Sequence, residues 1–317
     1  MAIRFTRAKI RSRGPVLKIT RAERAANRRL RERLIEAFEP IFEEIVRQYR
    51  LDTVAELRRQ VATGAAIGIP VNASRAFEAA LQVGLSDLLR DAIARGARLG
   101  LRNSEAIPGI SMDPAAITEF AREYVERVGA NRITGTIATA DRAAIREIVR
   151  DVLASDYSST EAARRIGQRV GLTTRQARTL ELFEQALVRQ RIPTPEANTQ
   201  LARESINQDV ERRRETLVRQ RANLIAEVEA QDGIQEGQRA FWEQAIERGE
   251  VESDALLKRW FTVRDGRECP ICEPLHRQVR PFSQDFVSPA GWSGPRPLAH
   301  PRCRCDVDYG TPAQLAD

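Results

Sequence analysis

Cysteine and histidine are confined to one short stretch of this sequence, and this confinement constrains the fold more than any other feature. All four cysteines and both histidines lie between Cys269 and Cys305, and a random distribution along the chain would not gather them there. Cys269 and Cys272 are spaced as C-x2-C, a turn that lets two thiolates converge on one ion. His300 and Cys303 are spaced as H-x2-C, and Cys305 completes a C-x-C pair. The spacing predicts a metal site.

These five side chains offer nitrogen and sulfur donors for one tetrahedral Zn²⁺ site. Alternate residues of an extended segment share a face, so Cys303 and Cys305 can point the same way. The sequence leaves open which four of the five bind, and His276 is a reserve donor. The two cysteines of the C-x2-C pair rank first and Cys303 next, and His300 competes with Cys305 for the fourth place.

The predicted role of the zinc is structural. It would cross-link the ends of a loop with few apolar residues, and such sites contribute on the order of 10 kcal/mol to folding. Disulfides are the main alternative, because the number of cysteines is even. However, the segment from Met1 to Gly14 is basic with no apolar core after it, so we expect a reducing compartment, which disfavours disulfides. A catalytic zinc needs an open coordination position and a nearby base, and nothing singles one out.

The same stretch resembles the phage Mu F-like minor head proteins, the phage head morphogenesis family. The resemblance rests on the order K-x-W-x-T-x-x-D-x-R-x-C-x-x-C, followed by P-x-x-H-P-x-C-R-C. The resemblance is clear over about the last 60 residues, and a weaker similarity extends to residues 171–173 and 221–229. The first 130 residues match no family that we can name. Departures at Lys258 and in the loop 291–295 do not affect a donor. The matching positions are Lys258, Trp260, Thr262, Asp265, Arg267, Cys269, Cys272, Pro297, His300, Pro301, Cys303, Arg304 and Cys305.

The resemblance implies a structural minor capsid protein of a tailed phage that acts in head morphogenesis. Members of this family lie at or near the portal vertex and are implicated in head assembly and in DNA packaging or ejection. The implied partners are the portal protein and other head proteins. The implied location is the virion, with the host cytoplasm during assembly.

Positive charge is concentrated at the N-terminus. Residues 1–33 hold twelve Lys and Arg against two acids, whereas the whole chain carries only +7. A basic arm over residues 1–20 is expected to contact DNA phosphates or an acidic protein surface, because clustered Lys and Arg release counterions from nucleic acid. A solvated tail is the alternative with equal support.

Signatures of enzymes and membrane proteins are absent from the sequence. No run of 18 apolar residues occurs, so we predict no membrane span. The three lysines, Lys9, Lys18 and Lys258, do not form the G-K-[ST] of a phosphate-binding loop, and G-x-G-x-x-G, H-E-x-x-H and G-x-S-x-G are also missing. Two histidines leave little for a metal-dependent nuclease or hydrolase. We therefore expect a protein that is not an enzyme.

Apolar residues spaced by three and four predict a mainly α chain. Pro40 is expected to kink or split the first helix, and Gly233 to end the longest one. Strands are expected at 256–263 and 306–309, beside the cysteines. The expected helices cover 21–49, 52–63, 72–100, 114–128, 141–154, 160–170, 174–189, 195–232 and 234–248.

The predicted fold class is an elongated multi-helix body with a small zinc-stapled α+β module at its C-terminal end. The predicted domains are the basic arm 1–20, an N-terminal helical region 21–133, a helical body 134–255 and a zinc-binding module 256–317. The body would contain the long helix of about 195–232.

One segment suggests an alternative function. The helices expected at 160–180 resemble a helix-turn-helix, whose second helix would offer Arg175, Gln176 and Arg178 to a DNA groove. The chain would then be a zinc-containing DNA-binding protein. An ordinary αα-hairpin explains the same pattern and is far commoner. Thr173 and Gln176 have the spacing of a capping box at the start of the second helix.

Overall fold

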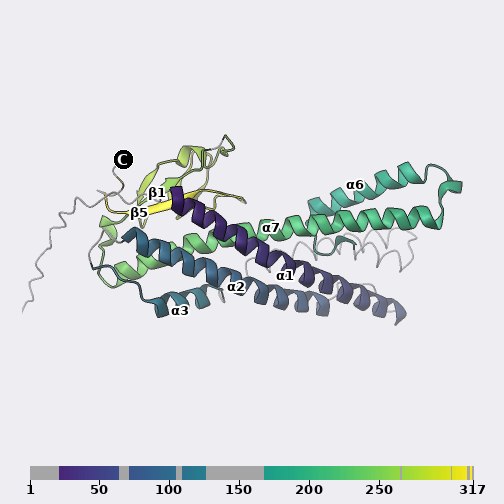
Figure 1. Ribbon diagram of the computed structural model, residues 1–317, viewed down its shortest axis with the longest axis horizontal. Coiled ribbons are helices and arrows are strands. Elements are labelled where there is room, and N and C mark those ends of the chain that lie inside the picture. Colours follow the sequence, from purple (N-terminus) through teal and green to yellow (C-terminus); the bar gives the residue numbers. More distant parts are fainter. Residues whose placement is uncertain are drawn as a thin grey trace, which may run out of the picture. The chain divides into compact units, whose positions relative to one another are not determined.

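The computed structural model describes residues 21–63, 71–104, 109–125, 168–264, 266–300, 302–312 and 315. These residues are mainly helical, and a small antiparallel sheet lies near the C-terminal end (Figure 1). A Cys/His cluster lies in the same part of the chain. The predicted mainly α class is therefore confirmed. None of the described helices combines the length and apolarity that a membrane crossing needs. The predicted basic arm, residues 1–20, lies outside the described residues.

The chain divides into two compact units, each built from separate stretches. Unit 1 comprises residues 1–30, 91–121 and 231–317, and unit 2 comprises residues 31–90 and 122–230. The three longest described helices each contribute to both units. The domain boundaries expected from the sequence remain predictions, because much of the stretch around residue 133 lies outside the described part.

Helix α1 (Arg21–Ala62) is one helix, although two were expected here. It continues through Pro40 because an apolar stripe on both sides of the proline is buried in unit 2, which outweighs the local cost of the missing N–H. Tyr49 of α1 stacks on Phe77 of α2 (Val71–Ser104) with ring centroids 4.4 Å apart. Pro40 therefore does not split the helix, and the predicted break between 49 and 52 was wrong. The buried stripe consists of Leu34, Phe38, Phe42 and Val46.

Helix α3 (Pro114–Tyr124) begins where the sequence predicted. The Asp113 carboxylate accepts a hydrogen bond from the backbone N–H of Ala115 at 2.9 Å, as expected of an N-cap followed by proline. The helices expected at 141–154 and over most of 160–170 lie outside the described residues.

Helix α6 (Thr174–Arg191) has the predicted capping box. The Gln176 N–H donates to Thr173 Oγ1 at 3.2 Å, and the Thr173 N–H donates back to Gln176 Oε1 at 3.1 Å. Helix α6 lies beside the first half of α7 (Gln200–Glu247), as Figure 1 shows, and Gln176 Nε2 donates to the Leu217 carbonyl at 2.9 Å. Its buried contact residues are Ala177, Leu180 and Leu187.

Helix α7 differs from the two helices expected at 195–232 and 234–248. A short 3-10 turn, η2 (Pro195–Ala197), precedes it, and α7 then passes through Gly233 without interruption. A glycine inside a helix costs about 1 kcal/mol relative to alanine. In unit 1 the packing of α7 against α2 offsets the cost of the glycines in α7. The two helices approach so closely at Gly237 that a Cβ there would lie 2.0 Å from the Ile93 carbonyl oxygen. The prediction that Gly233 ends the helix was wrong.

The C-terminal part of unit 1 contains a three-stranded antiparallel sheet in the order β2-β1-β5. Strands β1 (Leu257–Phe261) and β5 (Asp306–Gly310) pair along their whole length, and β2 (Val279–Pro281) pairs with the other edge of β1. The strands expected at 256–263 and 306–309 are confirmed. The remaining short elements are η3 (Ser253–Ala255), η4 (Glu273–Leu275), β3 (Phe286–Val287) and β4 (Ser293–Gly294), of which the last two form a hairpin.

The core of unit 1 surrounds this sheet. Trp260 of β1 is fully buried, and its ring meets the rings of Phe286 and Trp292 edge-on, each at 5.3 Å. Trp242 of α7 belongs to the same apolar cluster, as do the three buried cysteines. The sulfur atoms therefore lie at the border between the aromatic core and the loops that carry them.

Candidate metal centre

Two turns, each closed by a backbone hydrogen bond, hold four of the predicted donors. In the first, the Cys272 N–H donates to the Cys269 carbonyl at 3.1 Å, and in the second the Cys303 N–H donates to the His300 carbonyl at 3.1 Å. Both turns have proline in second place, C-P-I-C and H-P-R-C, where proline presets the φ that a β-turn needs. Arg302 has φ 62°, the left-handed value that a type II turn requires in third place. We call these two turns the knuckles; both are closed by a backbone hydrogen bond, but only the second has a left-handed residue in third place.

The sulfur atom of Cys272, in the first knuckle, lies close to two donor atoms of the second. Cys272 Sγ lies 3.3 Å from His300 Nε2 and 3.9 Å from Cys303 Sγ. A tetrahedral zinc with bonds of about 2.3 Å to sulfur and about 2.0 Å to nitrogen separates its donors by about 3.6 to 3.8 Å. A cavity of about 30 Å³ adjoins these side chains, which is room for one ion or water. The residues present fit a zinc ion.

All five predicted donors belong to this cluster. Cys269, Cys272 and His300 form one group whose donor atoms lie within 4.8 Å of one another, and Cys272, Cys303 and Cys305 form a second. Cys272 belongs to both groups. Three of the cysteines are buried and Cys269 is half-buried. The structure therefore brings the sequence-predicted residues together in positions that could hold a metal ion.

The thiols of the cluster perturb one another. The pKa of Cys303 is lowered, mainly because the Cys272 thiol hydrogen-bonds to it, and the pKa of Cys272 is raised for the same reason. Such a cluster holds one sulfur as a thiolate beside neutral thiols. A cation would replace the shared protons and favour the thiolate form of each ligand.

Cys305 has a second contact that the other donors lack. Its Sγ donates to Thr262 Oγ1 at 3.8 Å, and the Thr262 hydroxyl donates to the Cys272 carbonyl at 2.8 Å. Thr262 thus links Cys305 to the first knuckle by way of its hydroxyl group. Which of His300 and Cys305 completes the ligand set stays a prediction.

His276, the reserve donor, has a different role. Its Nδ1 accepts the backbone N–H of Thr262 at 3.1 Å, and its ring lies edge-on to Phe261 with centroids 5.2 Å apart. It belongs to neither donor group. Its pKa is lowered, mainly by burial and further by the charges of Arg264 and Arg277, which keeps the imidazole neutral and able to accept. His276 therefore joins β1 to the turn after the first knuckle.

Helix α7 positions the second knuckle through buried polar groups that the sequence did not reveal. Gln231 Nε2 donates to the Cys305 carbonyl at 2.9 Å, and Gln235 Nε2 donates to the Asp306 carboxylate at 3.1 Å. Arg296 donates to Glu236 at 2.8 Å and also to Asp232. These contacts fix the chain on both sides of the knuckle. Because the sequence placed a helix end at Gly233, it gave no reason to expect them.

Lys258 is a second feature that the sequence left unexplained. Its side chain is almost fully buried, its Nζ donates to the Pro295 carbonyl at 2.7 Å, and it lies 5.1 Å from the Phe286 ring centroid. Burial lowers its pKa to about 8. Lys258 anchors the loop that leads from the β3–β4 hairpin to His300.

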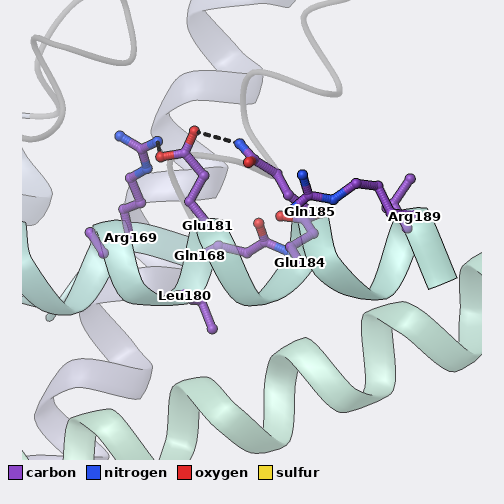
Figure 2. Close-up of a pocket in the computed structure, with 9 residues that line it drawn as sticks. Gln168, Arg169, Leu180, Glu181, Glu184, Gln185 and Arg189 are labelled. Atoms are coloured by element: carbon purple, nitrogen blue, oxygen red, sulfur yellow. Dashed lines mark hydrogen bonds and ion pairs between the residues drawn. The ribbon is translucent and has the colours of Figure 1, made fainter.

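Unit 2 contains a larger cavity of about 370 Å³ along α6, shown in Figure 2. Its polar groups bind one another: Arg169 pairs with Glu181 at 3.3 Å, and Gln185 donates to the same carboxylate at 3.3 Å. Cysteine and histidine are absent from its lining. Its acidic residues are Glu181, which is paired, and Glu184.

The residues of the proposed DNA-reading helix are only partly available to a groove. Arg175 and Arg178 are exposed, and Arg178 pairs with Glu181 at 3.0 Å. The Gln176 side chain is occupied by the capping box and by the Leu217 carbonyl. The second helix of the pair thus packs against α7, and most of the first lies outside the described residues.

Comparisons with protein-family models, with curated proteins and with solved structures found no match to this chain.

Proposed function

We propose that this chain is a structural protein of a tailed-phage head, whose C-terminal module is held together by one Zn²⁺. The observation that carries the proposal is the gathering of two proline-containing knuckles, Cys269–Cys272 and His300–Cys303, around Cys272 Sγ, which lies 3.3 Å from His300 Nε2 and 3.9 Å from Cys303 Sγ. The order of these residues is also what resembles the Mu F-like minor head proteins. The proposed role is head morphogenesis at the portal vertex, with DNA packaging or ejection. The basic arm would be a further contact with DNA.

The paired knuckles favour one set of ligands. Cys269, Cys272, His300 and Cys303 are the first and last residues of two turns that are each closed by a backbone hydrogen bond, and four protein ligands are usual in structural zinc sites. Cys305 is the fifth donor, and its contact with Thr262 gives it a role outside the coordination sphere. A closed set of four protein ligands leaves no position for substrate, which supports a structural metal rather than a catalytic one.

The ligand set is tested by measuring zinc per chain in full-length protein purified without chelators. We expect one zinc per chain, retained by Cys305→Ser and lost from Cys272→Ser together with thermal stability. Cys305→Ser is the matched control, since it removes a buried thiol of the same cluster. Loss of zinc from Cys305→Ser with retention in His300→Ala would contradict the proposed set.

The proposed partner is tested separately. The zinc-loaded chain would be co-expressed with a tailed-phage portal protein encoded in the same genome, and the portal ring would be isolated by size. We expect the chain to comigrate with the ring, and the metal-free Cys269→Ser/Cys272→Ser variant to comigrate less. A zinc-loaded chain that never associates with portal rings or assembled heads would overturn the head-protein assignment without affecting the metal assignment.

A further inference from the structure

Arginines gather around the metal knuckles of unit 1. Arg267, Arg302 and Arg304 line the cavity beside the cysteines, and Glu268 is the one acidic residue in that lining. Arg264 and Arg277 lie near His276, because their charges contribute to the lowering of its pKa. The segment from Thr262 to Arg264 joins the two groups. Three arginines thus line the candidate metal centre, and two more lie near His276.

The charges of this region do not cancel among the described residues. A zinc ion with three thiolates and one imidazole carries a charge of −1, so Arg267 and Arg304 can balance the metal centre and Glu268. Arg264, Arg277 and Arg302 remain, and all three are exposed. Among the described residues, none of them has an ion-pair partner, whereas arginines elsewhere, such as Arg219 and Arg248, are paired with glutamates.

The backbone holds two of these arginines in an uncommon conformation. Arg277 has φ 65° and Arg302 has φ 62°, a region that residues other than glycine and asparagine seldom occupy. Each arginine follows a histidine of the metal region closely, at a reversal of the chain. A side chain in this conformation costs of order 1 kcal/mol, and glycine would avoid that cost. The exposed guanidinium groups are therefore candidates for a function.

The composition of the surface indicates what it could bind. In the described part of residues 256–312 no aromatic ring is exposed, and the only exposed large apolar side chains are Val279 and Val287. Single-stranded nucleic acid is bound with stacking aromatic rings, and protein interfaces have apolar, aromatic-rich centres. A surface that has exposed guanidinium groups but neither stacking rings nor an apolar centre suits the phosphates of duplex DNA. The planar guanidinium group of arginine can contact a phosphate through two hydrogen bonds.

We propose that Arg264, Arg277 and Arg302 form a phosphate-binding surface by which the metal module holds duplex DNA without reading its sequence. This surface is distinct from the basic arm at residues 1–20. This inference extends the proposed function of the chain. It depends on the three arginines and not on the contact with the portal.

The test is the salt dependence of binding to a labelled mixed-sequence DNA duplex, followed by fluorescence anisotropy with the full-length, zinc-loaded chain. The test variant is Arg264→Gln/Arg277→Asn/Arg302→Asn, in which asparagine tolerates the left-handed backbone. The matched control is Arg58→Gln/Arg75→Gln/Arg98→Gln, which removes three exposed arginines of α1 and α2 that have no ion-pair partner among the described residues. Any contribution of the basic arm to DNA binding is the same in the test variant and in the control variant.

Each lost phosphate contact reduces the slope of log K against log salt by about 0.9. We expect the test variant to lower the slope by about 2.7, so that between 50 and 200 mM salt its affinity falls about 40-fold less than that of the wild type. The control should keep the wild-type slope. Equal slopes for the test and control variants would overturn the proposal, as would tighter binding of polyglutamate than of DNA through the same arginines.

Zinc content and the thermal transition of each variant establish that the module is intact. If the triple variant lost its zinc, Arg264→Gln alone would decide, because Arg264 lies outside both knuckles. We expect this single change to lower the slope by about 0.9, and an unchanged slope would overturn the proposal.

Discussion

The crossing of α2 and α7 in unit 1 offers a sharp test of the packing. Gly96 of α2 is so close to α7 that a Cβ there would lie 2.0 Å from the Ile234 carbonyl oxygen and 2.8 Å from its carbonyl carbon. The obstacle is backbone, so Gly96→Ala must push the two helices apart by roughly 1 Å or more. Overpacking of this kind costs about 1–3 kcal/mol, and we expect the upper end because a helix axis moves less easily than a side chain.

The intrinsic preference of the helix acts in the opposite direction. Replacing a glycine inside a helix by alanine stabilises the helix by about 1 kcal/mol. The expected net effect of Gly96→Ala is therefore a loss of about 2 kcal/mol in the free energy of unfolding. Gly84→Ala is the matched control in the same helix, since its Cβ would meet only the side chains of Ile41 and Ile45, which can rotate away.

The assay is urea denaturation of the full-length, zinc-loaded proteins, monitored by far-UV circular dichroism. We expect Gly84→Ala to equal or exceed wild-type stability and Gly96→Ala to fall below it. Gly237→Ala should cost a similar amount, because its Cβ would lie 2.0 Å from the Ile93 carbonyl oxygen. The double variant should cost less than the sum, since separating the helices once relieves both clashes. A Gly96→Ala protein as stable as Gly84→Ala would refute the close crossing.

Three further changes test unit 1. His276→Asn keeps an acceptor for the Thr262 N–H. Because the His276 pKa is lowered on folding, the stability of the wild type at saturating zinc should fall as the pH drops below 6.5, and the stability of the variant should not. Parallel stability curves for the two proteins would contradict this. The pKa of Lys258 is about 8 in the folded chain against 10.5 in the unfolded chain. The unfolding free energy of the wild type should therefore rise by up to roughly 3 kcal/mol from pH 8 to 10.5 relative to Lys258→Met. Chemical denaturation across this pH range measures the difference. Arg259 and Asp308 form a buried pair at 3.1 Å, so Asp308→Asn should cost about 3–5 kcal/mol in the same assay, whereas a cost below 1 kcal/mol would contradict burial of the pair.

Local sequence signals predicted the parts of the fold that local chemistry decides. The Thr173–Gln176 capping box and the Asp113 N-cap need only residues within one turn, and both are present. The clustering of the donors was also predictable, because cysteine and histidine are so rare in this chain that their spacing carries the information.

Long-range packing decided what the sequence could not. Pro40 and Gly233 are local helix breakers, but buried contacts on both sides carry α1 and α7 through them. Gln231 and Gln235 resemble any polar helix residues in the sequence, and only the return of β5 alongside α7 makes them partners of Cys305 and Asp306.

The most direct test of the central claim is X-ray absorption at the zinc edge on the purified full-length chain. Ligation by three cysteines and one histidine gives three sulfur atoms at about 2.3 Å and one nitrogen at about 2.0 Å. We expect that shell, at one zinc per chain, with His300→Ala losing the nitrogen contribution and Cys305→Ser leaving the spectrum unchanged. A chain that contains no zinc, or a zinc surrounded by oxygen atoms, would contradict the claim that these knuckles form a structural zinc site.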